Sequence, residues 1–252
     1  PGMRIRTYSN LGYQNLFLKY ESEYFNVIKK NFETVIQNVL TESNFIPLWT
    51  KNFLLNIKNL DSIPLFNPHK KNLGNNLAVI VCAGPNLLND LEVIKNNRDK
   101  ITIFTVDTAL KVLKEYNIVS DFIISLDGQY YSINDYIKDI PNQSALILDA
   151  ISYPKISRIH KNIYYTITEN IFDENIIEYF FNYNQINKFG IITGGNVSDY
   201  AASFAISLGF KNIYFSGLDL SYTSFQSHCK FSPFYFRTFY LSDYYNSMDS
   251  IY

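Results

Sequence analysis

Residues 193–222 read TGGNVSDYAASFAISLGFKNIYFSGLDLSY and join a glycine turn, a helix, a strand and a strand-end carboxylate in one unit. The turn Thr193-Gly194-Gly195-Asn196 can expose backbone N–H groups at the start of a helix, where the helix dipole also favours a phosphate. The spacing of apolar residues predicts a helix over 197–208, which Gly209 ends. A β-rich run over 212–216 then leads to Asp219, at the sheet edge where ligands bind in open α/β folds. The unit therefore predicts a ligand-binding module.

The same order of elements recurs upstream. Apolar runs of strand length lie at 77–82, 101–106, 122–126 and 145–148, with a further strand expected at 163–167. The first run ends in the turn Ala83-Gly84-Pro85-Asn86, followed by a helical pattern over 87–95. Strands that alternate with helices favour a parallel sheet, because parallel neighbours need crossover connections. We therefore expect an α/β fold: a Rossmann-like, mostly parallel sheet with helices on both faces.

Four aspartates close the predicted strands: Asp107, Asp127, Asp149 and Asp219. In a parallel sheet all four lie near one rim, where they are candidate ligand-binding groups. An aspartate at a strand end is often only the N-cap of the next helix, and this role competes with ligand binding at Asp107 and Asp149. Asp127 and Asp219 each have a glycine close by, which lets a ligand approach the backbone.

The chain divides into two expected parts. Residues 1–75 form a helical extension and linker, because apolar residues recur at helical spacing over 13–40 and prolines make 63–68 extended. Residues 76–252 form the Rossmann-like domain. Residues 171–184 are expected to be partly helical, and 223–252 show little periodicity. Pro1-Gly2 resembles a cloning scar, and the missing terminating motif fits either the front of a longer protein or a short one.

Composition narrows the classes of function. The net charge of −1 does not mark an electrostatic binder of nucleic acids. No apolar run approaches the ~20 residues of a membrane span, and no secretory signal is present. The 21 Tyr and 20 Phe match an AT-rich codon bias, so they are not taken as a carbohydrate platform. Cys82 and Cys229 make no disulfide framework, which favours a reduced, cytoplasmic setting.

Four motifs together resemble one family: AGPNL at 83–87, TVDTALKVL at 105–113, SDFIISLDG at 120–128 and the 193–222 unit. They resemble the bacterial motility-associated-factor (Maf) glycosyltransferases, whose central domain is also called hydroxymethylpterin-diphosphokinase-like after archaeal relatives. The resemblance covers about 77–228, with a weaker match at 48–56. The family usually has Ser at the position of Asn86, and either side chain can cap the helix that follows.

Residues 193–219 are also similar to the bacterial sialyltransferases that use CMP-sialic acid. Those enzymes carry a tyrosine two residues after the aspartate that matches Asp219. Here Ser221 occupies that position and Tyr222 follows it, which leaves the role of Tyr222 in donor binding open.

The three histidines differ in their context. His69 follows a proline in the linker, and His160 lies in a basic turn. His228 follows Asp219 by nine residues, and both similar families place a histidine after that aspartate. An imidazole that titrates near neutral pH suits removal of a proton from an acceptor hydroxyl, so His228 is either a catalytic base or a plain loop histidine. His228-Cys229 has no partner motif that would complete a metal or nucleophile site, and no metal ligand is assigned.

The resemblance implies a glycosyltransferase that moves a nonulosonic acid from a CMP-activated donor to Ser or Thr of a protein such as flagellin. The turns at 83–86 and 193–196 would hold the nucleotide, Asp127 and Asp219 would position hydroxyls, His228 would be the base, and no cofactor is required. The alternative is pyrophosphate transfer from ATP to a hydroxymethylpterin, with Mg²⁺ on Asp107 and Asp127. A third reading is a nucleotide-binding domain without catalysis. The helical extension and the aromatic C-terminal part favour the transferase.

Overall fold

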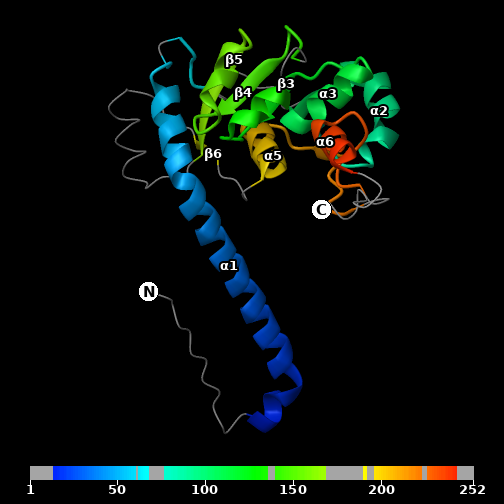
Figure 1. Ribbon diagram of the computed structural model, residues 1–252. Helices are drawn as coiled ribbons and strands as arrows, with labels where there is room; N and C mark the ends of the chain where they lie inside the picture. The colour runs from blue at the N-terminus through cyan, green and yellow to red at the C-terminus, as the bar shows by residue number, and fades with distance from the viewer. Residues whose placement is uncertain are drawn as a thin grey trace. The chain divides into compact units, whose positions relative to one another are not determined.

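The computed structural model describes residues 14–60, 62–67, 77–135, 140–168, 190–191, 196–222 and 226–242 (Figure 1). The chain forms two compact units, Pro1–Pro47 and Leu48–Tyr252. Helix α1 (Gln14–Ile57) supplies the described part of the first unit and continues into the second. The predicted N-terminal helix is confirmed, and it extends beyond residue 40 and through Pro47. Within the described ranges, no helix combines the length and apolarity that a membrane span requires.

The second unit is built on one parallel sheet. Its described strands are β1 (Leu77–Val81), β2 (Ile101–Val106), β3 (Phe122–Ser125), β4 (Ala145–Asp149), β5 (Ile163–Thr168), β6 (Gly190–Ile191) and β7 (Ile213–Ser216). Their order is β6-β5-β4-β3-β2-β1-β7, and each recorded pairing is parallel. Figure 1 shows β3, β4 and β5 side by side. The predicted α/β sheet is confirmed, and its strands read as continuous apolar runs because both faces are covered.

Helices cover the two faces of this sheet. They are α2 (Leu87–Asn96), α3 (Asp107–Glu115), α5 (Val197–Ser207) and α6 (Pro233–Leu241), with short 3-10 turns at Arg98–Lys100, Tyr130–Asp135 and Pro154–Arg158. Neighbouring residues of a strand point to opposite faces. Phe122 of β3 packs edge-on against Phe204 of α5, with ring centroids 5.7 Å apart. The next residue, Ile123, clusters with Leu110 of α3. Helices α3 and α5 therefore lie on opposite sides of the sheet.

The strand order reverses once. The chain steps outward from β1 to β6, and α5 then carries it back so that β7 pairs with the free side of β1. Parallel crossovers are right-handed, so the reversed direction is what moves α5 to the other face. The carboxyl ends of β1 and β7 consequently lie at the switch point of the sheet, where ligands bind in open α/β folds.

Helix α6 was not predicted. It begins at Ser232, whose side chain accepts a hydrogen bond from the Tyr235 N–H, and Pro233 occupies its first position. Both residues are typical of helix starts. The many aromatic residues nearby hide the helical period. The helix expected over 171–184 and His69 both lie outside the described residues.

Two asparagines fasten the end of α1 to the sheet. The Asn52 Nδ2 donates to the carbonyl oxygens of Gly128 and Ile151, both at 2.9 Å. The Asn56 Nδ2 donates to those of Ala150 and Ser152, both at 2.8 Å. Both side chains are buried, so they provide hydrogen-bond donors to backbone carbonyl groups in the loops after β3 and β4. The upstream motif at 48–56 thus has a structural role.

We predict that Asn52→Ala lowers the free energy of unfolding by about 1–3 kcal/mol, because two buried carbonyl groups lose their donor. Chemical denaturation measures the loss. Asn44→Ala, at an exposed position of the same helix, is the matched control and should change the free energy by less than about 0.5 kcal/mol. Equal losses for the two variants would contradict a clamp at Asn52.

Candidate functional site

The ends of β1 and β7 approach each other so closely that only glycine fits at two positions. The Gly84 N–H donates to the Gly217 carbonyl at 2.8 Å. A Cβ atom on Gly84 would lie 2.4 Å from that oxygen and 2.6 Å from Oδ2 of Asp219. Gly217 has a φ of +68°, and its Cβ would lie 2.2 Å from the Cys82 carbonyl oxygen. Both glycines are therefore required by close backbone approach.

Asp219 reaches across this junction to helix α2. Its Oδ2 accepts a hydrogen bond from the Asn86 N–H at 2.8 Å, at the position where a helix start has unpaired donors. Asn86 precedes the helix, yet its own side chain makes no capping hydrogen bond. The capping hydrogen bond expected from the Asn86 side chain is absent, and the Asn86 N–H is instead bound by a carboxylate 133 residues later in the chain.

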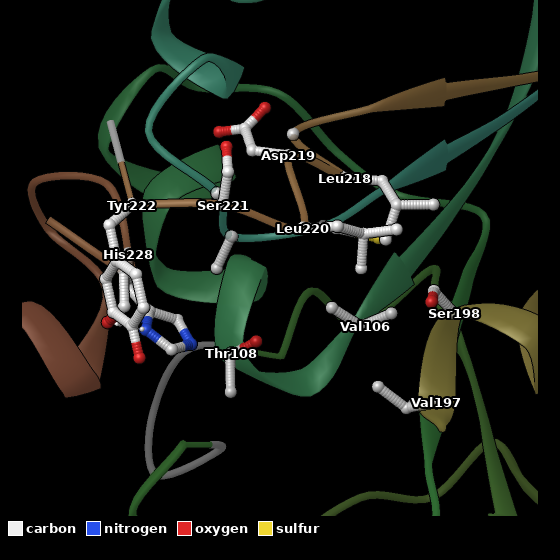
Figure 2. Close-up of a pocket in the computed structure, with 15 residues that line it drawn as sticks. Val106, Thr108, Val197, Ser198, Leu218, Asp219, Leu220, Ser221, Tyr222 and His228 are labelled. Atoms are coloured by element: carbon white, nitrogen blue, oxygen red, sulfur yellow. Dashed lines mark hydrogen bonds between the residues drawn. The ribbon is translucent and has the colours of Figure 1, made fainter. Parts of the chain in front are cut away.

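A pocket of about 430 Å³ opens at this junction (Figure 2). Its walls come from the turn after β1, the junction of β2 and α3, the start of α5, and the chain after β7. The lining residues are 82–84, Val106, Thr108, Val197, Ser198, 217–222, Ser227 and His228. Figure 2 shows His228 and Tyr222 together at one end, and Val197 and Ser198 at the other. Four of the predicted site residues line this pocket: Gly84, Asp219, Tyr222 and His228. Pro85 lies in the adjoining turn and is not part of the lining.

His228 is held in place from three directions. Its Nδ1 lies 2.8 Å from Ser227 Oγ, and its ring stacks on Phe234 with centroids 4.7 Å apart. The next residue, Cys229, donates its N–H to the Ala83 carbonyl at 2.8 Å. Burial lowers the pKa of His228 below its ordinary value, so the imidazole is neutral at pH 7 and can accept a proton.

The start of α5 supplies the opposite end of the pocket. Asn196 is the N-cap: its Oδ1 accepts from the Asp199 N–H at 2.9 Å and from Ser198 Oγ at 2.5 Å. The capping role of Asn196 leaves it beside the lining rather than in it. Thr193, Gly194 and Gly195 lie outside the described residues, so their predicted role in binding a phosphate stays a prediction.

Asp107 and Asp127 lie further along the same rim. Asp107 Oδ1 accepts from the Thr108 N–H at 2.8 Å, and Asp127 Oδ1 accepts from the Gln129 N–H at 2.8 Å. Burial raises the pKa of Asp127. A further carboxyl, Asp135, has its pKa raised to about 7 by burial and then by the charges of Asp107 and Asp127. In the part of the chain that the structure describes, no three metal-binding side chains gather to hold an ion.

Asp149 is structural. It is fully buried, and its carboxylate accepts hydrogen bonds from the Ile151 N–H, from Thr168 Oγ1 at 2.7 Å and from the Tyr200 hydroxyl at 3.2 Å. The Tyr200 hydroxyl also contacts Thr166 Oγ1. Burial raises the pKa of Asp149 to about 6. The group ties α5 to the sheet and lies away from the pocket lining.

Sequence reasoning did not single out several residues at this site. Ser227 precedes the candidate base, but its sequence context gives it no role of its own. Ser198 resembles an ordinary residue in the first turn of a helix. Leu220 has a φ of +49° and is 87% exposed, and Asp135 comes within reach of Asp107 only through the fold. The adjacency of Ser227 to His228 is the one signal that was readable in the sequence.

Comparisons with known proteins agree with this architecture. The family model described as 6-hydroxymethylpterin diphosphokinase MptE-like matches residues 51–225. An uncharacterized protein of Treponema pallidum (strain Nichols) is 33% identical over 121 residues, which are 48% of this chain and 53% of that protein. The structure of a Maf glycosyltransferase from Magnetospirillum magneticum AMB-1 aligns with a TM-score of 0.52 and 23% identity, over 60% of this chain and 24% of that one. The resemblance identified from the four motifs is confirmed, and the alignment with the Maf structure shows a shared fold. The chain spans about half the length of its T. pallidum relative.

We predict that Gly84→Ala lowers the free energy of unfolding by about 3 kcal/mol, because the new methyl group meets a carbonyl oxygen and the Asp219 carboxylate that cannot both retreat. Gly128→Ala is the milder counterpart, since its Cβ would lie 3.1 Å from its nearest neighbours. Its expected loss is about 1 kcal/mol. Thermal and chemical denaturation compare the two, and a smaller loss at Gly84 than at Gly128 would contradict the tight junction.

Proposed function

The chain belongs to the 6-hydroxymethylpterin diphosphokinase MptE-like family, and we propose that it is a glycosyltransferase that binds a CMP-activated nonulosonic sugar between β1 and β7. The acceptor is a Ser or Thr hydroxyl group of a protein such as flagellin. One observation carries the proposal. The neutral, anchored imidazole of His228 lines the pocket that lies at the switch point of the sheet. That switch point is where α/β proteins bind nucleotides.

The proposed transfer begins with the acceptor hydroxyl group. His228 takes its proton through Nε2, the oxygen bonds to the anomeric carbon of the sugar, and the bond from that carbon to the donor phosphate breaks. CMP leaves with both electrons of the broken bond. For Nε2 to accept a proton, Nδ1 must carry the other, and it then donates to Ser227 Oγ at 2.8 Å. The Ser227 hydroxyl can accept that hydrogen bond, so the contact is compatible with the tautomer that the reaction needs.

The lining of the pocket suits a phosphate leaving group. Backbone N–H groups at the start of α5 and the hydroxyls of Ser221 and Tyr222 line the space. Such donors are fixed before the reaction, so they stabilise negative charge on the leaving oxygen without reorganising. Tyr222 is 66% exposed, so a bound sugar or base can reach its ring.

The family description favours a second candidate, pyrophosphate transfer from ATP to a pterin. That reaction needs Mg²⁺ held by carboxylates beside the triphosphate. Asp107 and Asp127 each have one oxygen engaged by a nearby N–H group, and the described residues bring no third metal ligand to them. Mg²⁺ in such sites is held by one or two carboxylates with water and phosphate oxygens, so Asp107 and Asp127 are the residues that would hold it.

We predict that His228→Ala keeps CMP affinity within about threefold and lowers the rate of sugar transfer by about 10²–10⁴-fold, as removal of a positioned base does. Ser227→Ala should lower the rate by a smaller factor. Titration calorimetry and a transfer assay measure the two effects. His160→Ala is the matched control, because His160 contacts the carbonyl oxygen of Ser144 at the amino end of β4, away from the pocket. An unchanged rate of sugar transfer by His228→Ala would contradict the assignment of His228 as the base. ATP use that needs Mg²⁺ and is lost only in Asp107→Asn and Asp127→Asn would support the pterin enzyme instead.

The pH dependence follows from the lowered pKa of His228. Transfer should rise with pH, reach half of its maximum below the ordinary histidine value of 6.5, and stay level above it. The sign is fixed because burial disfavours the protonated imidazole, which cannot act as a base. Values of kcat/KM measured between pH 5 and 8 give this pH profile. A midpoint above 6.5 would contradict a buried base.

A further inference from the structure

The start of α2 already holds an anion. A helix N-terminus attracts phosphates because its unpaired N–H groups and the helix dipole both favour negative charge. Here the Asn86 N–H is bonded to Asp219 Oδ2 at 2.8 Å, and this carboxylate belongs to the pocket lining. The glycine turn at 83–86 is therefore occupied by a carboxylate of the protein itself.

The carboxylate cannot easily move out of that position. The Gly84–Gly217 hydrogen bond fixes the backbone two residues before Asp219. One residue earlier, the Ser216 hydroxyl donates to Asp90 Oδ2 of α2 at 2.7 Å. The end of β7 is thus tied to the first turns of α2 at several points, and Asp219 is one of them.

The charge of Asp219 reaches the pocket floor. Burial, and then the carboxylates of Asp107, Asp219 and Asp199 in that order, together raise the pKa of the Cys82 thiol to about 12. Cys82 lines the pocket, so a ligand there meets the negative field of the same three groups. Each phosphate that a ligand adds increases the repulsion.

We infer that Asp219 is a specificity-determining residue, whose carboxylate fills the anion position at the start of α2 and restricts the pocket to donors with a single phosphate. This inference rests on the proposed nucleotide-sugar donor. A CMP ester brings one phosphate, to which the N–H groups at the start of α5 can donate hydrogen bonds. A second or third phosphate would extend toward α2 and meet the carboxylate that occupies the Asn86 N–H.

Calorimetric titration with CMP, CDP and CTP in the presence of EDTA tests the selectivity. The unmutated protein should bind CMP most tightly and CTP least. In Asp219→Asn the amide oxygen keeps the hydrogen bond from Asn86 without the charge, so the affinities for CDP and CTP relative to CMP should rise about five- to tenfold. Glu92→Gln removes an exposed carboxylate from the same helix and should leave the ratios unchanged. Ratios in Asp219→Asn within twofold of those of the unmutated protein would overturn the inference, as would equal binding of CMP and CTP before mutation.

A second variant separates this inference from the proposed function. Asp219→Ala opens the start of α2, so inorganic phosphate should raise the Tm of this variant and not that of the unmutated protein. Glu92→Ala should show no phosphate effect. If the unmutated protein binds no cytidine nucleotide, the proposed donor and the selectivity both fail, while a phosphate effect confined to Asp219→Ala still assigns the anion position. An equal phosphate effect on the unmutated protein and Asp219→Ala would overturn that assignment.

Discussion

The close approach of two parallel strand ends is the constraint on which the site depends. Gly84 and Gly217 let β1 and β7 come within one backbone hydrogen bond of each other immediately after the sheet ends. That approach directs the chain after β7 over the start of α2, where Asp219 finds the Asn86 N–H. A side chain at either glycine would push the strand ends apart, and the pocket wall formed by residues 217–222 would move with them.

Both ends of the proposed reaction are positioned from β1. The donor side is fixed by Gly84 and Asp219, and the base side by the hydrogen bond from the Cys229 N–H to the Ala83 carbonyl. The stack of His228 on Phe234 adds the first turn of α6 to this arrangement. Two neighbouring residues of one strand end thus set the distance between a bound donor and the imidazole. Backbone contacts rather than flexible side chains determine that distance, which suits a reaction between two ordered groups.

Much of the fold was readable from the sequence because the sheet is buried on both faces. The run 101–106 was predicted with its observed bounds, since six apolar or β-branched residues bounded by polar ones leave few alternatives. The pairing of β7 with β1 was not predicted, because strand order depends on contacts far apart in the chain. The same limit applies to the start of α2, where the expected Asn86 side-chain cap is absent and the Asn86 N–H is instead bound by Asp219. The aromatic stretch after residue 223 hid α6 because bulky residues occupy every face of that helix.

The order of the strands also decides how the sheet is completed. β1 is enclosed between β2 and β7 in the finished sheet, yet it is made first and β7 last. Until residue 216 has left the ribosome, one side of β1 remains an open strand edge of apolar residues, the kind of edge that pairs with other chains. Closing it joins Asn86 to Asp219 across 133 residues, a contact of high sequence separation that forms slowly. The pocket therefore cannot form until β7 has paired with β1, and a chain held at the preceding stage keeps an open strand edge.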